Sequence, residues 1–136
     1  MPRPAAGDAW AVGEISCGCG PGLSLTERWN GKAWKQVASP SPGGGAGLSD
    51  VAVVSARIAW AVGETGSGDG PTKTLTLRWD GTAWRKVPAP SRGASASLSA
   101  VAVTSSRNAW AVGATSVVNH GSSTTVILRW NGTTWN

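Results

Sequence analysis

The sequence contains no phenylalanine and no tyrosine, yet nine of its 136 residues are tryptophan. It has a single histidine, and only 14% of its residues are charged. This skewed aromatic composition indicates that one Trp-bearing unit was copied several times. With 19 glycines and 8 prolines, about a fifth of the chain consists of turn-forming residues. Many short strands therefore fit the composition better than long helices.

Other absences limit the classes of partner. The formal net charge is +5 and the pI is near 10, but Lys and Arg never occur three in a row. We therefore expect no nucleic-acid partner. No apolar stretch reaches the roughly 18 residues that a membrane-spanning helix needs, so we expect no membrane partner. The opening "MPRPAAGDAW" also lacks the apolar segment of a signal peptide, and this chain is not expected to direct export by itself.

Short motifs recur at a fixed period. "AWAVG" begins at Ala9, Ala59 and Ala109, a constant spacing of 50 residues. A second element, "RW[ND]G", begins at residues 28, 78 and 129, so the last copy carries one inserted residue between the two motifs. All nine tryptophans fall in this frame: Trp10, Trp60 and Trp110; Trp29, Trp79 and Trp130; Trp34, Trp84 and Trp135. A repeat of this length is typical of propellers and arrays.

The middle copy predicts four short strands, at residues 48–55, 58–64, 73–79 and 83–90. In the second of these, Trp60 and Val62 alternate with Ala59, Ala61 and Gly63, which sets a bulky face against a small one. The fourth runs into prolines, which cannot donate to a ladder and suit an outer edge.

Sheets of this kind stack on copies of themselves, because large side chains fill the space over small ones. Radial stacking of four-stranded sheets gives a β-propeller, whose usual repeat length this matches. A two-layer β-sandwich uses the same strand lengths but needs no fixed period. We therefore predict an all-β fold, a partial β-propeller with just under three four-stranded antiparallel blades in an open arc.

The three predicted blades form a single incomplete propeller domain over residues 1–136, with boundaries at 8–38, 48–90 and 98–136. The first blade lacks an innermost strand, and the third has a truncated outer strand. Because propellers close with four to eight blades, two interpretations remain. The chain is a fragment of a longer protein, which the mismatched ends favour, or it forms a homo-oligomer in which, for instance, two chains supply about six blades.

"AWAVGE" followed by "LTLRWDGTAWRKVPAPS" resembles the kelch and galactose-oxidase type of repeat over residues 8–136. The chain departs from this family's pattern at two places. The family's glycine pair is here a single glycine followed by Glu14, Glu64 or Ala114, and its usual Tyr before the acidic residue is here a Trp. Aspartate-box propeller repeats are a second resemblance. The resemblance implies a β-propeller and an exported, extracellular bacterial protein.

The lack of tyrosine removes the Tyr-containing copper site of galactose oxidase and the Tyr nucleophile of sialidases. The family's activities are therefore not carried over to this chain. The pair Cys17 and Cys19 in "CGC" has the spacing of a partial soft-metal site or a strained disulfide. Because a structural metal site usually needs four ligands, we interpret the two as a chance loop pair. His120 has no acid or nucleophile fixed near it. We predict no catalytic residue, no metal and no cofactor.

The tryptophans are the best residues for binding a sugar ring, but their alternating strand positions favour packing between blades. A lectin-like role with shallow sugar sites between blades remains an alternative. Propeller loops carry function more often than strands do, and the loops at 14–22, 64–72, 114–124, 39–47 and 89–97 share one face. They offer these ligand-binding candidates: Glu14, Glu64, Asp69, Arg92, Asn119 and His120.

From these observations we expect a non-catalytic scaffold that binds a protein or glycan ligand. A second alternative is part of a propeller enzyme whose catalytic groups lie outside this chain.

The repeated stretch "LRWDGTAW", residues 77–84, predicts a hairpin. Its Asp-Gly pair suits a primed turn with positive φ. A two-residue turn would set Trp84 opposite Leu77, whereas a four-residue turn would set it opposite Trp79. In both registers the two tryptophans share one face of the sheet. Asp80 is replaced by asparagine in the other copies, which indicates a backbone role more than a charge.

Overall fold

The computed structural model describes residues 9–16, 22–42, 45–66, 71–91, 93–116 and 123–136. Within them, ten strands form three antiparallel sheets and there is no helix. The first sheet comprises β1 (Trp10–Ile15), β2 (Leu23–Trp29) and β3 (Trp34–Val37). The middle sheet comprises β4 (Ala46–Ser55), β5 (Ile58–Thr65), β6 (Lys73–Trp79) and β7 (Trp84–Val87). The third comprises β8 (Ser95–Ser105), β9 (Asn108–Ser116) and β10 (Ser123–Trp130). The predicted all-β class is thus confirmed.

Each sheet is a meander in which strands that are consecutive in the sequence are hydrogen-bonded neighbours. Of the described strands, only those of the middle sheet reach the four that the repeat predicts. In the third sheet a single bridge between Trp130 and Trp135 follows β10. β7 ends at Val87, directly before Pro88, as expected for an outer edge strand.

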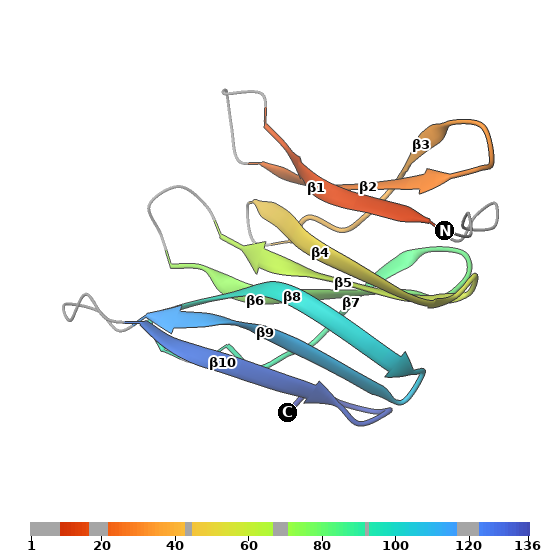
Figure 1. Ribbon diagram of the computed structural model, residues 1–136. Coiled ribbons are helices and arrows are strands. Elements are labelled where there is room, and N and C mark those ends of the chain that lie inside the picture. The colour runs from red at the N-terminus through yellow and green to blue at the C-terminus, as the bar shows by residue number, and fades with distance from the viewer. Residues whose placement is uncertain (1–8, 17–21, 43–44, 67–70, 92, 117–122) are drawn as a thin grey trace.

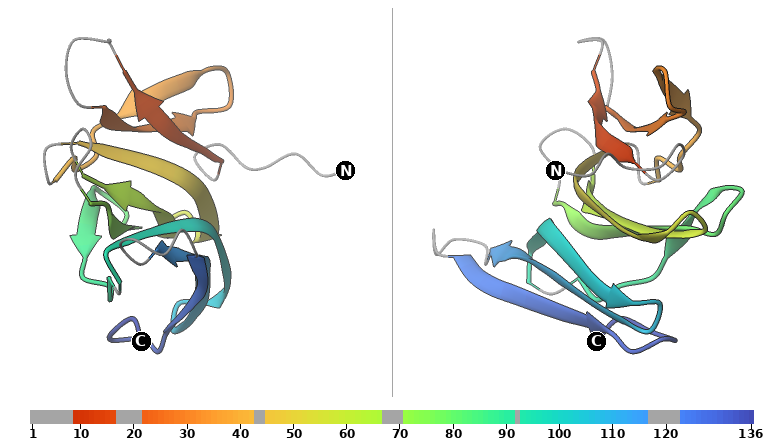
Figure 2. Two further views of the ribbon diagram at one scale, coloured as in Figure 1. Left: turned by 90° about the vertical axis from the view of Figure 1, so that its left-hand side faces the viewer. Right: turned by 45° about the vertical axis from the view of Figure 1, so that its right-hand side comes forward.

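The three sheets lie face to face in chain order (Figure 1), and the turned views in Figure 2 show the same open stack. β1, β5 and β9 all end at the same edge of the stack, on the left in Figure 1. We call this the distal edge. Among the described residues no helix is long and apolar enough to cross a membrane.

Two hydrophobic cores fill the spaces between the sheets. Trp10 and Val12 of the first sheet pack with Ala59 and Ala61 of the middle sheet. One repeat later, Trp60 and Val62 pack with alanines 109 and 111 of the third sheet. The bulky side of one "AWAVG" strand therefore meets the small side of the next "AWAVG" strand, as the alternation in this motif predicts.

In the middle and third sheets the glycine of "AWAVG" lies very close to the inner strand. A Cβ atom added to Gly63 would lie 2.0 Å from the carbonyl oxygen of Gly47 on the neighbouring strand β4. At Gly113 the corresponding distance to the carbonyl oxygen of Ser97 is 1.9 Å. Both contacts lie near a register shift in the inner strand, between Leu48 and Asp50 in the middle sheet and one repeat later in the third. The glycine of "AWAVG" thus lets the two backbones approach.

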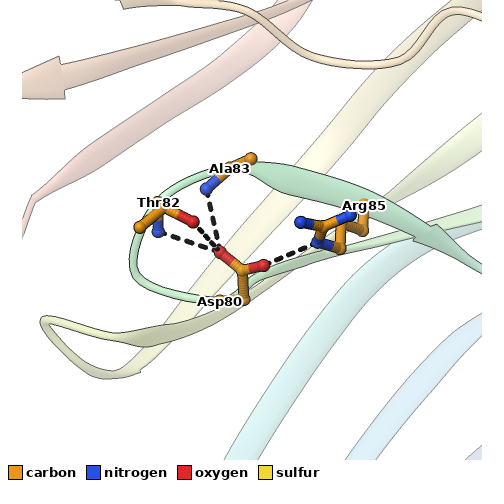
Figure 3. Close-up of polar contacts among 4 residues, drawn as sticks. All are labelled: Asp80, Thr82, Ala83 and Arg85. Atoms are coloured by element: carbon orange, nitrogen blue, oxygen red, sulfur yellow. Dashed lines mark hydrogen bonds and ion pairs between the residues drawn. The ribbon is translucent and has the colours of Figure 1, made fainter.

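The pairing of the hairpin tryptophans shows the register of the turn. Trp79 pairs with Trp84, as Trp29 does with Trp34. The connection is therefore the four-residue turn, and the two-residue alternative is wrong. Asp80 explains the difference, because its Oδ1 accepts hydrogen bonds from the backbone nitrogens of Thr82 and Ala83, both at 2.9 Å (Figure 3). This closes a longer loop than a primed two-residue turn.

The same turn recurs with asparagine in the other two copies. Asn30 Oδ1 accepts from the nitrogens of Lys32 and Ala33, and Asn131 Oδ1 accepts from the two equivalent nitrogens, all at 2.8–2.9 Å. The following glycine has a φ of 96° to 100° in each copy, a left-handed conformation that glycine adopts without strain. The backbone role expected for Asp80 is thus shared by all three copies.

Candidate functional site

Two of the six candidate ligand-binding residues lie in the described part of the chain. Glu14 lies near the end of β1 and Glu64 near the end of β5, and both side chains are exposed at the distal edge. The other candidates, and the two cysteines, lie outside the described residues: Asp69, Arg92, Asn119 and His120; Cys17 and Cys19.

Hydrogen bonds between sheets build the distal edge. The backbone nitrogen of Ala46 donates to the carbonyl oxygen of Gly22 at 2.9 Å, which joins the start of β4 to the segment before β2. One repeat later, the nitrogen of Ala96 donates to the carbonyl oxygen of Thr72 at the same distance. The Thr72 hydroxyl also donates to the Ala96 carbonyl oxygen. The chain segments that flank the strands are therefore fixed at equivalent places in successive repeats.

A small cavity of about 110 Å³ opens between the first and middle sheets at this edge. Glu14, Glu64 and Thr72 line it, together with four glycines: Gly22, Gly45, Gly47 and Gly66. The glycines make room for the Glu14 carboxylate. A Cβ atom at Gly22 would lie 1.8 Å from Glu14 Oε1, and one at Gly47 would lie 3.0 Å from Glu14 Oε2. The cavity thus combines acidic residues with open backbone.

A second cavity of about 190 Å³ occupies the equivalent place between the middle and third sheets. Most of its lining residues stand one repeat after those of the first cavity, but their side chains differ in chemistry. Four glycine positions become hydroxyl residues, namely Thr72, Ser95, Ser97 and Ser116, and the position of Glu64 becomes Ala114. The edge therefore carries an acidic cavity followed by a neutral, hydroxyl-rich one.

The sizes of these cavities limit what they accept. A third cavity, of about 280 Å³, lies near the outer strand of the middle sheet between Lys73 and Lys86. Enclosed small-molecule sites usually occupy about 300 to 1,000 Å³. The three described cavities fall below that range, so none of them is the size of a usual enclosed small-molecule site.

Within the described ranges, no group of three or more His, Cys, Asp or Glu residues lies where it could hold a metal ion. Neither Glu14 nor Glu64 forms an ion pair with another described residue. Both carboxylates are therefore available as hydrogen-bond acceptors, which is the chemistry that hydroxyl and amide donors require.

Among the described residues, the one carboxylate with a strongly perturbed pKa belongs to the turn. Arg85 Nε donates to Asp80 Oδ2 (Figure 3), and the two atoms are 2.6 Å apart. This hydrogen bond, together with those from the backbone of Thr82 and Ala83, holds the pKa of Asp80 well below its ordinary value. The group is exposed and is explained by the structure of the hairpin.

Most tryptophans serve the packing between sheets. Six are buried, and Trp34 and Trp110 are the two with large exposed fractions, 46% and 43%. Neither lines a described cavity. The buried aromatic clusters agree with the packing role expected for most of the indoles, and a sugar-stacking role stays a prediction for the two exposed ones.

The sequence placed Glu14 and Glu64 among the candidates but missed the glycines and serines that line the cavities with them. The available signal was positional, because residues 45–47 and 95–97 fall within loops expected to share a face with residues 14–22 and 64–72. No protein-family model, curated protein or solved structure matches this chain.

Proposed function

We propose that this chain is a non-catalytic scaffold of the β-propeller type that binds an extended ligand along its distal edge. A polysaccharide is the ligand class that fits best, and a protein loop is the alternative. The observation that carries the proposal is the pair of small cavities at equivalent places in successive repeats, each lined by side chains that can hydrogen-bond to a ligand.

A ligand with regularly spaced hydroxyl groups matches two such cavities better than a compact metabolite does. The Glu14 and Glu64 carboxylates would accept hydrogen bonds from ligand hydroxyls in the first cavity. In the second, the Ser95 and Ser97 hydroxyls both donate and accept. Contacts of this kind are individually modest, so affinity would come from several repeats acting together.

The radial arrangement is part of the proposal. It is supported by the 50-residue period, by the four-stranded middle sheet and by the repeated contact of one bulky face with the next small face. A kelch-like ancestry and export from a bacterial cell are proposed on the sequence resemblance alone.

The test is retention of the full chain on a panel of immobilised neutral and acidic polysaccharides, followed by calorimetry with the best binder. The variant Glu14→Gln, Glu64→Gln keeps the shape of the cavity but removes both charges. We expect about a tenfold or greater loss of affinity, because hydrogen bonds to charged groups contribute about 1.5–3 kcal/mol. Asp80→Asn, a carboxylate of the hairpin turn, serves as the matched control and should bind normally.

Equal binding by the double variant and by wild type would contradict the assignment of the site. Failure of every polysaccharide, combined with saturable binding of a protein that the double variant abolishes, would move the ligand class from glycan to protein.

A further inference from the structure

The exposed apolar residues of the described chain gather on its two outermost sheet faces. Six large hydrophobic side chains are exposed, three on the first sheet and three on the third: Ile15, Leu23 and Trp34; Trp110, Val112 and Ile127. On the first sheet they occupy the face turned away from the middle sheet. We call it the tail face, and it also carries Glu27 and Trp29. The opposite outer face, on the third sheet, is the head face, and it also carries Arg129.

At each internal interface, the face of one sheet that corresponds to the head face packs on the face of the next sheet that corresponds to the tail face. Trp10 contacts the hairpin tryptophans Trp79 and Trp84, with ring centroids 4.8 and 4.9 Å apart and interplanar angles of 59° and 76°. Trp60 contacts Trp130 and Trp135 at 4.8 and 5.0 Å, with angles of 58° and 78°. One indole thus lies on a pair of indoles, and the geometry repeats almost unchanged.

The outermost faces hold the two separate halves of a third such contact. Trp29 and Trp34 on the tail face form the same pair, with centroids 5.6 Å apart at 55°, compared with 5.8 Å at 54° for Trp79 and Trp84. Trp110 on the head face is the corresponding single indole. It is 43% exposed, whereas its equivalents Trp10 and Trp60 are 7% and 0% exposed. The halves are therefore preorganised before they meet.

The arginines show the same incomplete pattern. The guanidinium of Arg28 lies 5.3 Å from the ring centroids of Trp10 in its own sheet and Trp79 in the next. Arg78 likewise lies over Trp60 and Trp130, at 5.7 and 5.9 Å. On the head face Arg129 lies 5.6 Å from Trp110, and among the described residues no ring from a following sheet lies over its other side.

The faces also complement each other in charge. Glu27 lies on the tail face at the position where Leu77 and Leu128 are buried in the other copies. It is two residues from Trp29 on the same strand, about 6–7 Å along the same face. An arginine that lies over Trp29 as Arg28 lies over Trp79 would be near this carboxylate.

We propose that the head face of one chain binds the tail face of a second copy, so that Trp110 lies on the Trp29–Trp34 pair and Arg129 lies between Trp110 and Trp29, near Glu27. This contact is heterologous, since it joins two different faces. Two copies would bring six sheets, within the four to eight that close a propeller ring. With the radial arrangement proposed above, on which this step rests, the product is a closed dimer with two identical contacts. The inference does not depend on any ligand of the distal edge.

The test is light scattering coupled to size-exclusion chromatography on the full chain over a series of concentrations. Wild type should reach twice the 13.8 kDa chain mass. Trp110→Asp removes the head contact and Trp34→Asp removes the tail contact, so each variant alone should remain a monomer. Arg85→Ala, an exposed change in the middle sheet, should leave the dimer intact. Circular dichroism and thermal melting should show that both Trp variants keep the fold, because both side chains are exposed.

Mixing the two Trp variants separates this arrangement from any symmetric one. The Trp34→Asp chain keeps a head face and the Trp110→Asp chain keeps a tail face, so the equimolar mixture should recover a heterodimer with a single contact. A face that pairs with itself would give no such complementation. Wild type that stays monomeric at every concentration, or a dimer indifferent to both Trp variants, would overturn the proposal. Glycan binding by the monomeric variants would persist, since each chain keeps both cavities, so failure here is distinguishable from failure of the ligand site.

Discussion

Trp60 of the middle sheet meets Trp135 of the third sheet edge to face, with ring centroids 5.0 Å apart and an interplanar angle of 78°. Trp60 is fully buried, and Trp135 is 3% exposed although it is the penultimate residue of the chain. Edge-to-face geometry is favourable because the positive edge of one ring meets the negative face of the other. The contact therefore holds the C-terminal residues against a sheet formed by residues far earlier in the sequence.

We expect Trp60→Ala to lower the free energy of unfolding by about 3–5 kcal/mol, the usual cost of deleting a fully buried large aromatic side chain. Urea denaturation measures the change. The matched comparison is Trp34→Ala, measured at a concentration where the chain is monomeric. Trp34 belongs to the hairpin of the first sheet and is about half exposed. Its loss should be less than half as large. Equal losses would show that the buried cluster does not hold the sheets together.

The glycine of "AWAVG" provides a second test. In Gly63→Ala the new Cβ atom would lie 2.0 Å from the Gly47 carbonyl oxygen, so backbone must shift at a cost of about 1–3 kcal/mol. Gly13 occupies the same place in the first repeat, but an added Cβ atom there would meet no atom of the described residues within 4 Å. Gly13→Ala should therefore be nearly neutral. Thermal melting of the two variants side by side decides the point, and equal destabilisation would contradict it.

The alternation of Trp60 and Val62 with alanine and glycine was enough to predict the sheet faces and the way they stack. This worked because both faces of the middle sheet are covered, so side-chain size decides what lies opposite. The turn between Trp79 and Trp84 was less predictable. An Asp-Gly pair suits a two-residue turn, but side-chain bonds from Asp80 to the backbone of the next residues favour four.

The candidate site was harder to predict than the fold. Glu14 and Glu64 could be selected because they follow a repeated motif, yet the cavity also depends on Gly22 and Gly47, whose role is to leave space. A glycine that acts only by leaving space belongs to no recognisable binding motif in the sequence. Trp110 is likewise exposed because no further described sheet covers it, although its sequence context is the same as that of the buried Trp60.

The Asp80 carboxylate should add an acid-sensitive contribution to stability. Its pKa in the folded chain lies below its ordinary value of 3.8, first because of Arg85 and then because of the backbone of the turn. Because folding lowers this pKa, the ionised carboxylate stabilises the fold at pH values above the pKa of the unfolded chain. This contribution is lost as the pH falls below about 4. In Asp80→Asn the turn should persist, as it does at Asn30, and that part of the acid dependence should disappear.

The measurement is denaturant unfolding of wild type and Asp80→Asn at a series of pH values from neutral to about 2. The two curves should differ at neutral pH and converge at low pH. Arg85→Ala keeps the carboxylate but removes its first partner, so its acid limb should lie between the other two. Parallel curves for wild type and Asp80→Asn over the whole range would contradict the assigned role.

Asp50 links the inner strands of two sheets. Its Oδ1 accepts a hydrogen bond from the nitrogen of Val51, and its Oδ2 accepts one from the nitrogen of Val101 on β8, both at 2.9 Å. Because the second bond crosses from the middle sheet to the third, Asp50→Ala leaves the Val101 N–H without this acceptor. A hydrogen bond to a charged group contributes about 1.5–3 kcal/mol, and we expect a loss of that size.

Two comparisons make this last prediction specific. Asp50→Asn retains one side-chain acceptor oxygen, so it should lose less than Asp50→Ala, while Ser49→Ala, an exposed neighbour, should change stability by less than about 0.5 kcal/mol. Amide hydrogen exchange provides a local measurement, since the Val101 amide should exchange faster in Asp50→Ala than in wild type. If stability fell while protection of that amide stayed unchanged, the loss would come from β4 alone. The inter-sheet hydrogen bond would then contribute nothing measurable.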